Sequence, residues 1–120
     1  MATVRQCRRA VDRLVATIDG LNDEDKSRHL PRRTVICIVS DLGVWFTARV
    51  DETGVHDVAL HSEISTLPSI ADVRVTLDSE DLVALAEGRE DILSAWLRGR
   101  VHVSAPMRDM LRLRALLGVL

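Results

Sequence analysis

Aromatic side chains are scarce in this chain of 120 residues, which contains Trp45, Phe46 and Trp96 and no tyrosine. Proteins that bind single-stranded nucleic acid stack the bases on such side chains, and few are available here. The formal net charge of −2 also gives no general attraction to a phosphate backbone. We therefore expect no nucleic-acid partner.

Long apolar runs are missing as well. No stretch approaches the ~20 consecutive apolar residues of a membrane-spanning helix, and the basic start, residues 1–13, lacks the apolar segment of a signal peptide. Cys7 and Cys37 lie far apart with no C-x-x-C spacing, which favours reduced thiols in apolar surroundings over a disulfide or a metal site. These absences predict a soluble, cytoplasmic protein.

Motifs for catalysis are also absent. The chain has no phosphate-binding loop, nucleophile elbow or dinucleotide fingerprint. His56 and His61 are an odd number of positions apart on one expected strand, so we expect them on opposite faces of the sheet. His102 is expected to face solvent, and His29 belongs to a polar connection. We expect no metal, no cofactor and no enzymatic activity.

The first two-thirds of the chain shows clear hydrophobic periodicity. Apolar residues at helical spacing predict a helix over Ala2–Ile18, followed by a polar surface connection up to Arg33. Runs of β-branched residues and strict alternation predict four strands within Thr34–Leu77, with the second and third joined by a turn at Asp51–Gly54. Trp45 is expected on an exposed face of this sheet.

The remainder predicts two short helices within Glu80–Arg98, a strand at Val101–Val103 and a final helix at Pro106–Leu117. Asp78 or Ser79 is expected to cap the first short helix. The buried stripe of the second is expected to consist of Ile92, Leu93, Trp96 and Leu97. The element order predicts one α+β domain over residues 1–120, with a five-stranded, mainly antiparallel sheet and helices packed on one face.

Two segments of this second half, Asp72–Gly88 and Ile92–Val103, resemble the sterol carrier protein type 2 family. In that family a strand, a capped helix, a second helix ending in glycine, a short strand and a final helix follow one another. The chain has this order from about Ala71 to Leu117. The resemblance implies a sterol-carrier-like fold that encloses an apolar tunnel for sterols, fatty acyl chains or similar lipids, with no covalent chemistry.

The resemblance also implies which residues form the tunnel wall. These are the inward-facing residues of the sheet and the apolar residues of the covering helices: Phe46, Ala48, Val73, Val75, Leu85, Trp96, Met107, Met110 and Leu111. The same apolar pattern is compatible with a close-packed interior, because natural cores are normally filled.

Two further interpretations concern the surface of the protein. Arg5, Arg9 and Arg13 lie opposite the apolar stripe of the first helix, where they form either a solvated face or a contact with an acidic membrane. The last helix has a wider apolar face than docking on the sheet requires. The alternative to a lipid carrier is therefore a protein-interaction module or homodimer that packs through this helix and the Trp45 face, without a ligand pocket.

Overall fold

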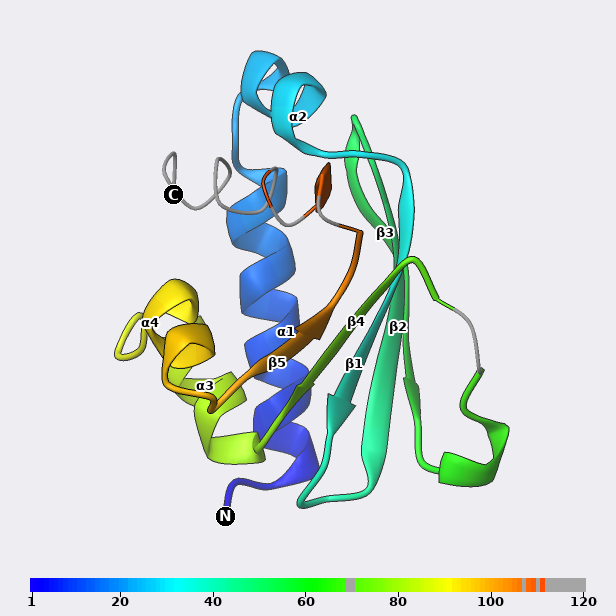
Figure 1. Ribbon diagram of the computed structural model, residues 1–120, viewed down its shortest axis with the longest axis vertical. Helices are drawn as coiled ribbons and strands as arrows, with labels where there is room; N and C mark the ends of the chain where they lie inside the picture. Colours follow the sequence, from blue (N-terminus) through cyan, green and yellow to red (C-terminus); the bar gives the residue numbers. More distant parts are fainter. Residues whose placement is uncertain (69–70, 107, 110, 112–120) are drawn as a thin grey trace.

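The computed structural model describes residues 1–68, 71–106, 108–109 and 111 (Figure 1). Its helices and strands follow the predicted order, with one additional helix. They are α1 (Val4–Asp19), α2 (Asp23–His29), β1 (Arg33–Val39), β2 (Val44–Asp51), β3 (Gly54–His61), a 3-10 turn (Ile64–Thr66), β4 (Val73–Leu77), α3 (Ser79–Ala86), α4 (Ile92–Leu97) and β5 (His102–Ser104). Arg108, Asp109 and Leu111 are helical, whereas most of the predicted final helix, with Met107 and Met110, lies outside the described residues.

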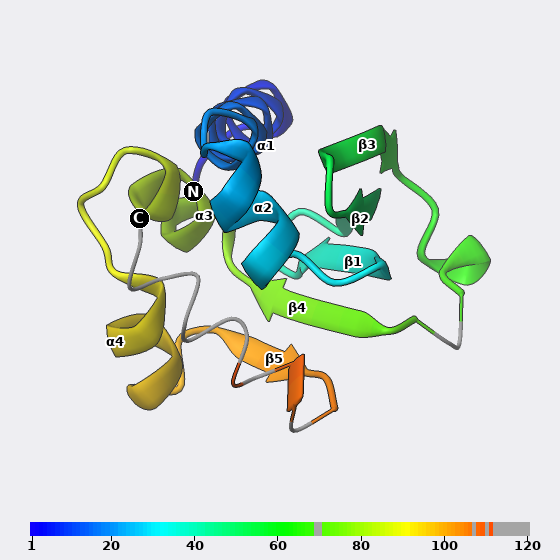
Figure 2. The same cartoon turned by 90° about the horizontal axis from the view of Figure 1, so that it is seen from above.

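The five strands form one sheet in the order β3-β2-β1-β4-β5. Neighbouring strands are antiparallel except for β1 and β4, which are parallel. Seen from above, α1 lies across one face of this sheet, with α2 beyond its end and α3 at its side (Figure 2). The predicted α+β fold with a mainly antiparallel sheet is therefore confirmed.

Helix α2 was not predicted, because its sequence is polar throughout and buries no residue. Local interactions explain it instead. The Asn22 side chain caps the helix by accepting a hydrogen bond of 2.8 Å from the backbone N–H of Asp25. Acidic residues occupy the first turn and basic residues the last, which suits the helix dipole. The expected surface connection is thus a short helix above one end of the sheet.

The first turn of α3 is capped from another part of the chain. Asp78 occupies the capping position but makes no capping hydrogen bond, so the predicted local cap is wrong. Its carboxylate accepts a hydrogen bond from Ser40 instead. The carboxylate of Asp41 accepts from both the backbone N–H (2.8 Å) and the hydroxyl (2.6 Å) of the fully buried Ser79. Burial raises the pKa of Asp41, but these hydrogen bonds outweigh it and hold the pKa below its usual value.

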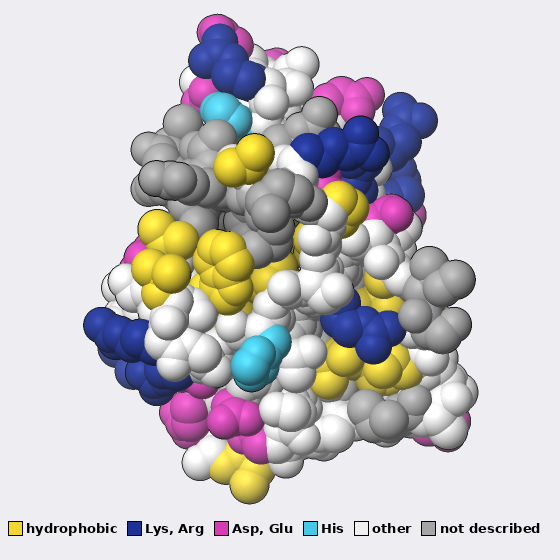
Figure 3. Space-filling view, viewed as in Figure 1, with side chains coloured by type: hydrophobic (Ala, Val, Ile, Leu, Met, Phe, Trp, Pro, Cys, Tyr) yellow, Lys and Arg dark blue, Asp and Glu magenta, His cyan; other side chains and the backbone are white. Residues whose placement is uncertain are grey.

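The predicted stripe of α4 is only partly correct. Ile92 and Leu93 are half-buried, but Trp96 is 38% exposed and Leu97 76% exposed. The residue that α4 buries completely is Ala95. A helix of this length turns only a narrow face inward, and a small residue lets it approach the neighbouring core closely. Apolar side chains gather on the surface over α4 as a result (Figure 3).

A bulge in β3 changes the expected arrangement of the histidines. Asp57 adopts a positive φ of 56°, and the register with β2 shifts between Thr47 and Arg49. His56 then pairs with Arg49 and His61 with Trp45, both on the sheet face that points away from α1. The prediction that the two histidines face opposite sides is therefore wrong, because the extra residue restores the same facing.

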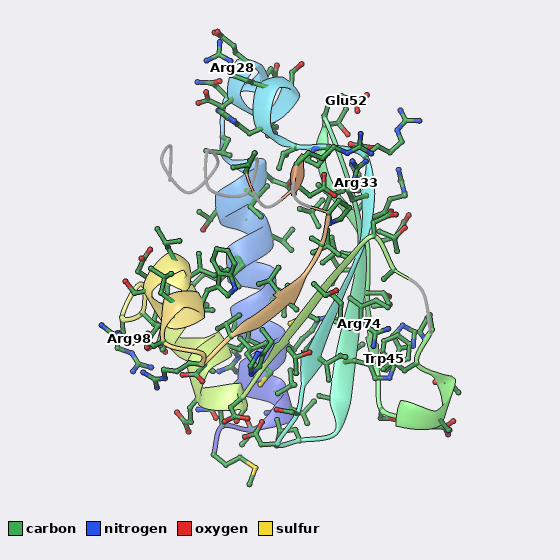
Figure 4. All side chains as sticks on the ribbon, viewed as in Figure 1. Arg28, Arg33, Trp45, Glu52, Arg74 and Arg98 are labelled. Carbon is green, nitrogen blue, oxygen red and sulfur yellow. The ribbon has the colours of Figure 1, made fainter. Side chains whose placement is uncertain are left out.

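Trp45 is buried rather than exposed, with 2% of its surface accessible. Its ring stacks on His61, with the ring centroids 4.1 Å apart, and its indole N–H donates a hydrogen bond of 3.1 Å to the carbonyl of Glu63. The segment after β3 thus covers this residue, which lies on the right-hand side of Figure 4. The prediction that Trp45 lies on an exposed face is therefore wrong.

On the other side of the sheet, the core lies between β1, β2, α1 and α3. Its buried members include Cys7, Val39, Phe46, Leu82 and Ala95. Among the described residues, no helix is both long enough and apolar enough to cross a bilayer.

Candidate functional site: a central apolar cavity

The space between α1 and the inner face of the sheet is not completely filled. It contains a cavity of about 290 Å³ whose wall is almost entirely apolar. For comparison, an engineered cavity of about 150 Å³ inside a protein stays dry and binds benzene. The volume here is therefore large enough for an organic ligand.

The strand register explains the cavity wall. One row across the inner face runs through Phe46, Cys37, Val75 and Val103, which are successive partners on β2, β1, β4 and β5. The next row consists of Ala48, Val35 and Val73. Apart from Phe46 these side chains are short, so they leave space beneath α1. From the helix side the cavity is closed by Val11, Leu14, Val15 and Ile18.

The predicted wall residues fall into three groups. Phe46, Ala48, Val73 and Val75 all line the cavity. Leu85 is half-buried on α3 beside the core cluster, and Trp96 and Leu111 are exposed, so these three lie away from the described lining. Met107 and Met110 are outside the described residues. That any of these residues contacts a ligand stays a prediction.

Cys37 lies on the cavity wall, where burial makes its thiol unreactive. Its thiol faces the cavity, and burial raises its pKa to about 12, with a smaller contribution from Cys7. A thiol with such a pKa carries almost no thiolate near neutral pH. Both cysteines are free, as expected.

One end of the cavity carries charge. Arg33 opens β1, two positions before Val35, and its guanidinium donates hydrogen bonds of 2.7 and 3.0 Å to the two carboxylate oxygens of Asp109. The side chain of Arg33 is 19% exposed and that of Asp109 only 4%. Both residues line the cavity, together with His29 at the end of α2. Figure 4 shows Arg33 near the upper end of the sheet, below α2.

Sequence reasoning missed this polar end. Asp109 was not predicted to be a site residue. It lies between two methionines in a segment with apolar periodicity, and this pattern is compatible with a buried carboxylate. Arg33 and His29 belonged to a stretch interpreted as solvated. No local signal connects them, because 76 positions separate Arg33 from Asp109.

A second groove, of about 250 Å³, lies between α1 and α3. It is lined by Arg9 and Arg13 of α1 and by Val83, Ala86 and Glu87 of the α3 region. Both arginines, like Arg5, are exposed, whereas Arg8 pairs with Asp12 along the helix. Within the described part of the chain, no group of three or more metal-ligating side chains comes together.

The fold and the site define a class of protein: an α+β domain with an apolar cavity between a five-stranded sheet and its helices. Residues 23–118 match the SCP-2 sterol transfer family, so the chain belongs to that family. A search among curated proteins gave no match.

Solved structures share the fold at low sequence identity. The crystal structure of sterol carrier protein 2 like 2 from Aedes aegypti is 16% identical, with a TM-score of 0.64 and 97% of each chain covered. A solution structure of the palmitated form of that protein is 14% identical, with a TM-score of 0.64 and coverage of 97% of this chain and 95% of the other. The sec-alkylsulfatase Pisa1 from a Pseudomonas species is 20% identical, with a TM-score of 0.58. The match covers 83% of this chain but only 14% of the sulfatase.

Proposed function

We propose that this protein binds and transfers a lipid-like apolar molecule in the cavity beneath α1, without catalysing a reaction. The observation that carries the proposal is the cavity itself, whose wall is nearly all apolar and whose sheet side includes Phe46, Ala48, Val73 and Val75. An apolar ligand gains roughly 25 cal/mol for each Å² that it removes from water. Family membership supports a transfer role in the general sense.

The volume favours one hydrocarbon chain. If about 150 Å³ holds one benzene molecule, each ligand carbon requires roughly 25 Å³. A cavity of about 290 Å³ then accommodates roughly 12 non-hydrogen atoms by the same ratio. A sterol has more than twice as many, so a single acyl or alkyl chain is the better fit. The palmitated Aedes protein offers a precedent for a chain-like ligand in this fold.

Lipid binding is tested on the purified protein. We expect solvent extraction followed by mass spectrometry to recover a co-purified lipid. We also expect the delipidated protein to take up the neutral fluorophore 1-aminonaphthalene, which is small enough for this volume, with one molecule per chain. The complex should be a monomer in light scattering. A concentration-dependent dimer through the exposed Trp96 and Leu97, with neither lipid nor fluorophore bound, would instead favour the interaction module.

A transfer protein must meet the membrane that supplies its ligand, and we propose that the exposed arginines of α1 make this contact. Each basic residue near an acidic surface contributes about 1 kcal/mol. No ion pair among the described residues engages Arg5, Arg9 or Arg13.

We also propose that the protein is located in the cytoplasm, and the free thiols of Cys7 and Cys37 are compatible with that location.

Vesicle sedimentation tests this contact. We expect the protein to sediment with phosphatidylglycerol vesicles at low salt and to stay in solution with phosphatidylcholine alone. Reversing two charges (Arg9→Glu with Arg13→Glu) should weaken binding by at least about 10-fold. Arg28→Glu with Arg32→Glu is the matched control, because it also reverses two exposed charges but away from α1, and it should bind like the parent. Equal sedimentation with both lipids would refute the proposal.

A further inference from the structure

The charges at the polar end of the cavity compensate each other. Two of the N–H groups of Arg33 point at the two carboxylate oxygens of Asp109, and a third donates to the carbonyl of Arg32 at 2.8 Å. Because almost none of the accessible wall is polar, this closed pair presents little hydrogen-bonding surface to a ligand. The opposite charges of Arg33 and Asp109 therefore cancel at this end of the apolar cavity.

Among the described residues, a second carboxylate, that of Asp72, acts on Arg33. The pKa of Arg33 is raised, first by its hydrogen bonds with Asp109 and then by the charges of Asp109 and Asp72. Asp72 accepts a hydrogen bond of 2.8 Å from the backbone N–H of Thr34, the residue after Arg33. Among the described side chains at this end, an anionic ligand would meet two carboxylates, a guanidinium that is already paired and the imidazole of His29.

From this arrangement we propose that the cavity selects neutral lipids, such as a fatty alcohol or ester, and excludes free fatty acids, and that Asp109 sets this selectivity by neutralising Arg33. The inference rests on the proposed lipid binding. A carboxylate buried at this end would lose its hydration and would find the described guanidinium already paired with Asp109, and uncompensated burial of an ion is strongly unfavourable. An alcohol or ester loses much less.

Ligand competition against 1-aminonaphthalene at about pH 8 tests the proposal with three ligands of equal chain length: decanol, methyl decanoate and decanoate. In the delipidated parent we expect decanol and methyl decanoate to displace the fluorophore at a concentration at least about 10-fold lower than decanoate. In Asp109→Asn, Arg33 carries an unneutralised charge. Decanoate affinity should then rise at least about 10-fold, while decanol and methyl decanoate change by less than about 3-fold.

Two further variants keep this result interpretable. Asp57→Asn removes an exposed carboxylate from β3, which pairs with Arg49 on the other side of the sheet, and should leave all three affinities unchanged. If Asp109→Asn does not fold, the double variant Arg33→Met with Asp109→Leu replaces both charges by apolar groups. It should bind the neutral ligands and still reject decanoate.

The outcomes separate this inference from the proposed function. Three results would each overturn the selectivity while lipid binding stands. The parent would bind decanoate as tightly as methyl decanoate, folded Asp109→Asn would keep the preference of the parent for neutral ligands, or the double variant would bind decanoate. Failure of 1-aminonaphthalene and all three ligands to bind would overturn the proposed function and the selectivity together.

Discussion

Substitution of Ala48 by phenylalanine is expected to remove most ligand binding and to leave the protein as stable as before. Ala48 lies in the middle of β2 with its side chain on the cavity wall. The added phenyl ring displaces roughly four methylenes of a bound chain, and each buried methylene contributes about 0.8 kcal/mol, so affinity should fall by about 100-fold or more. The ring itself gains contacts inside the space that it fills.

The matched control is the same substitution in the packed core. Ala95 of α4 is completely buried among Leu82, Val101 and their neighbours. A phenyl ring there has no space, and overpacking of this kind destabilises proteins by about 1–3 kcal/mol or more. Urea unfolding of the delipidated variants measures both changes. If Ala48→Phe is as destabilising as Ala95→Phe, the space beneath α1 is a filled core and the carrier function is refuted.

This comparison matters because the sequence alone does not distinguish a cavity from a core. Alternating valines on β4 and the β-branched run of β1 predict an apolar inner face in either case. Whether α1 rests directly on that face depends on how far each side chain reaches across the gap. Such distances follow from the packing of helix against sheet and carry no local pattern.

Hydrophobic periodicity predicted most of the architecture correctly, because the spacing of apolar residues within each strand or amphipathic helix indicates its buried face. The positions of Phe46, Ala48, Val73 and Val75 on the cavity wall follow from that regularity once the strands pair. Helix α2 shows the limit of the method. It has no apolar face, so only its cap and its charge distribution indicated a helix.

Interactions between distant residues were not predictable. The Asp41 cap of α3 and the Arg33–Asp109 pair each join positions far apart in the sequence. In both cases one partner belongs to a segment whose sequence is typical of a solvent-exposed connection. The two partners come together only in the folded chain. The bulge at Asp57 is similar, because a single extra residue reverses the facing of every side chain before it and leaves no clear signal in the sequence.

The second large effect is expected at Trp45, on the sheet face opposite the cavity. Trp45→Ala should reduce the free energy of unfolding by about 3–5 kcal/mol, because a buried indole loses its packing and a space remains. Trp45→Phe retains an aromatic ring against His61 but loses the hydrogen bond to Glu63, which should reduce it by roughly 1 kcal/mol beyond the smaller change in volume. Urea unfolding monitored by circular dichroism measures both.

The location of Trp45 also predicts what these variants retain. The cavity lies on the other face of the sheet, so folded Trp45→Phe should bind 1-aminonaphthalene with the affinity of the parent. If Trp45 instead belonged to an interaction surface, Trp45→Ala would lose little stability. It would then change the molecular mass of the assembly in light scattering. That result would return the Trp45 face to the role of a partner-binding surface, which its burial under the segment after β3 argues against.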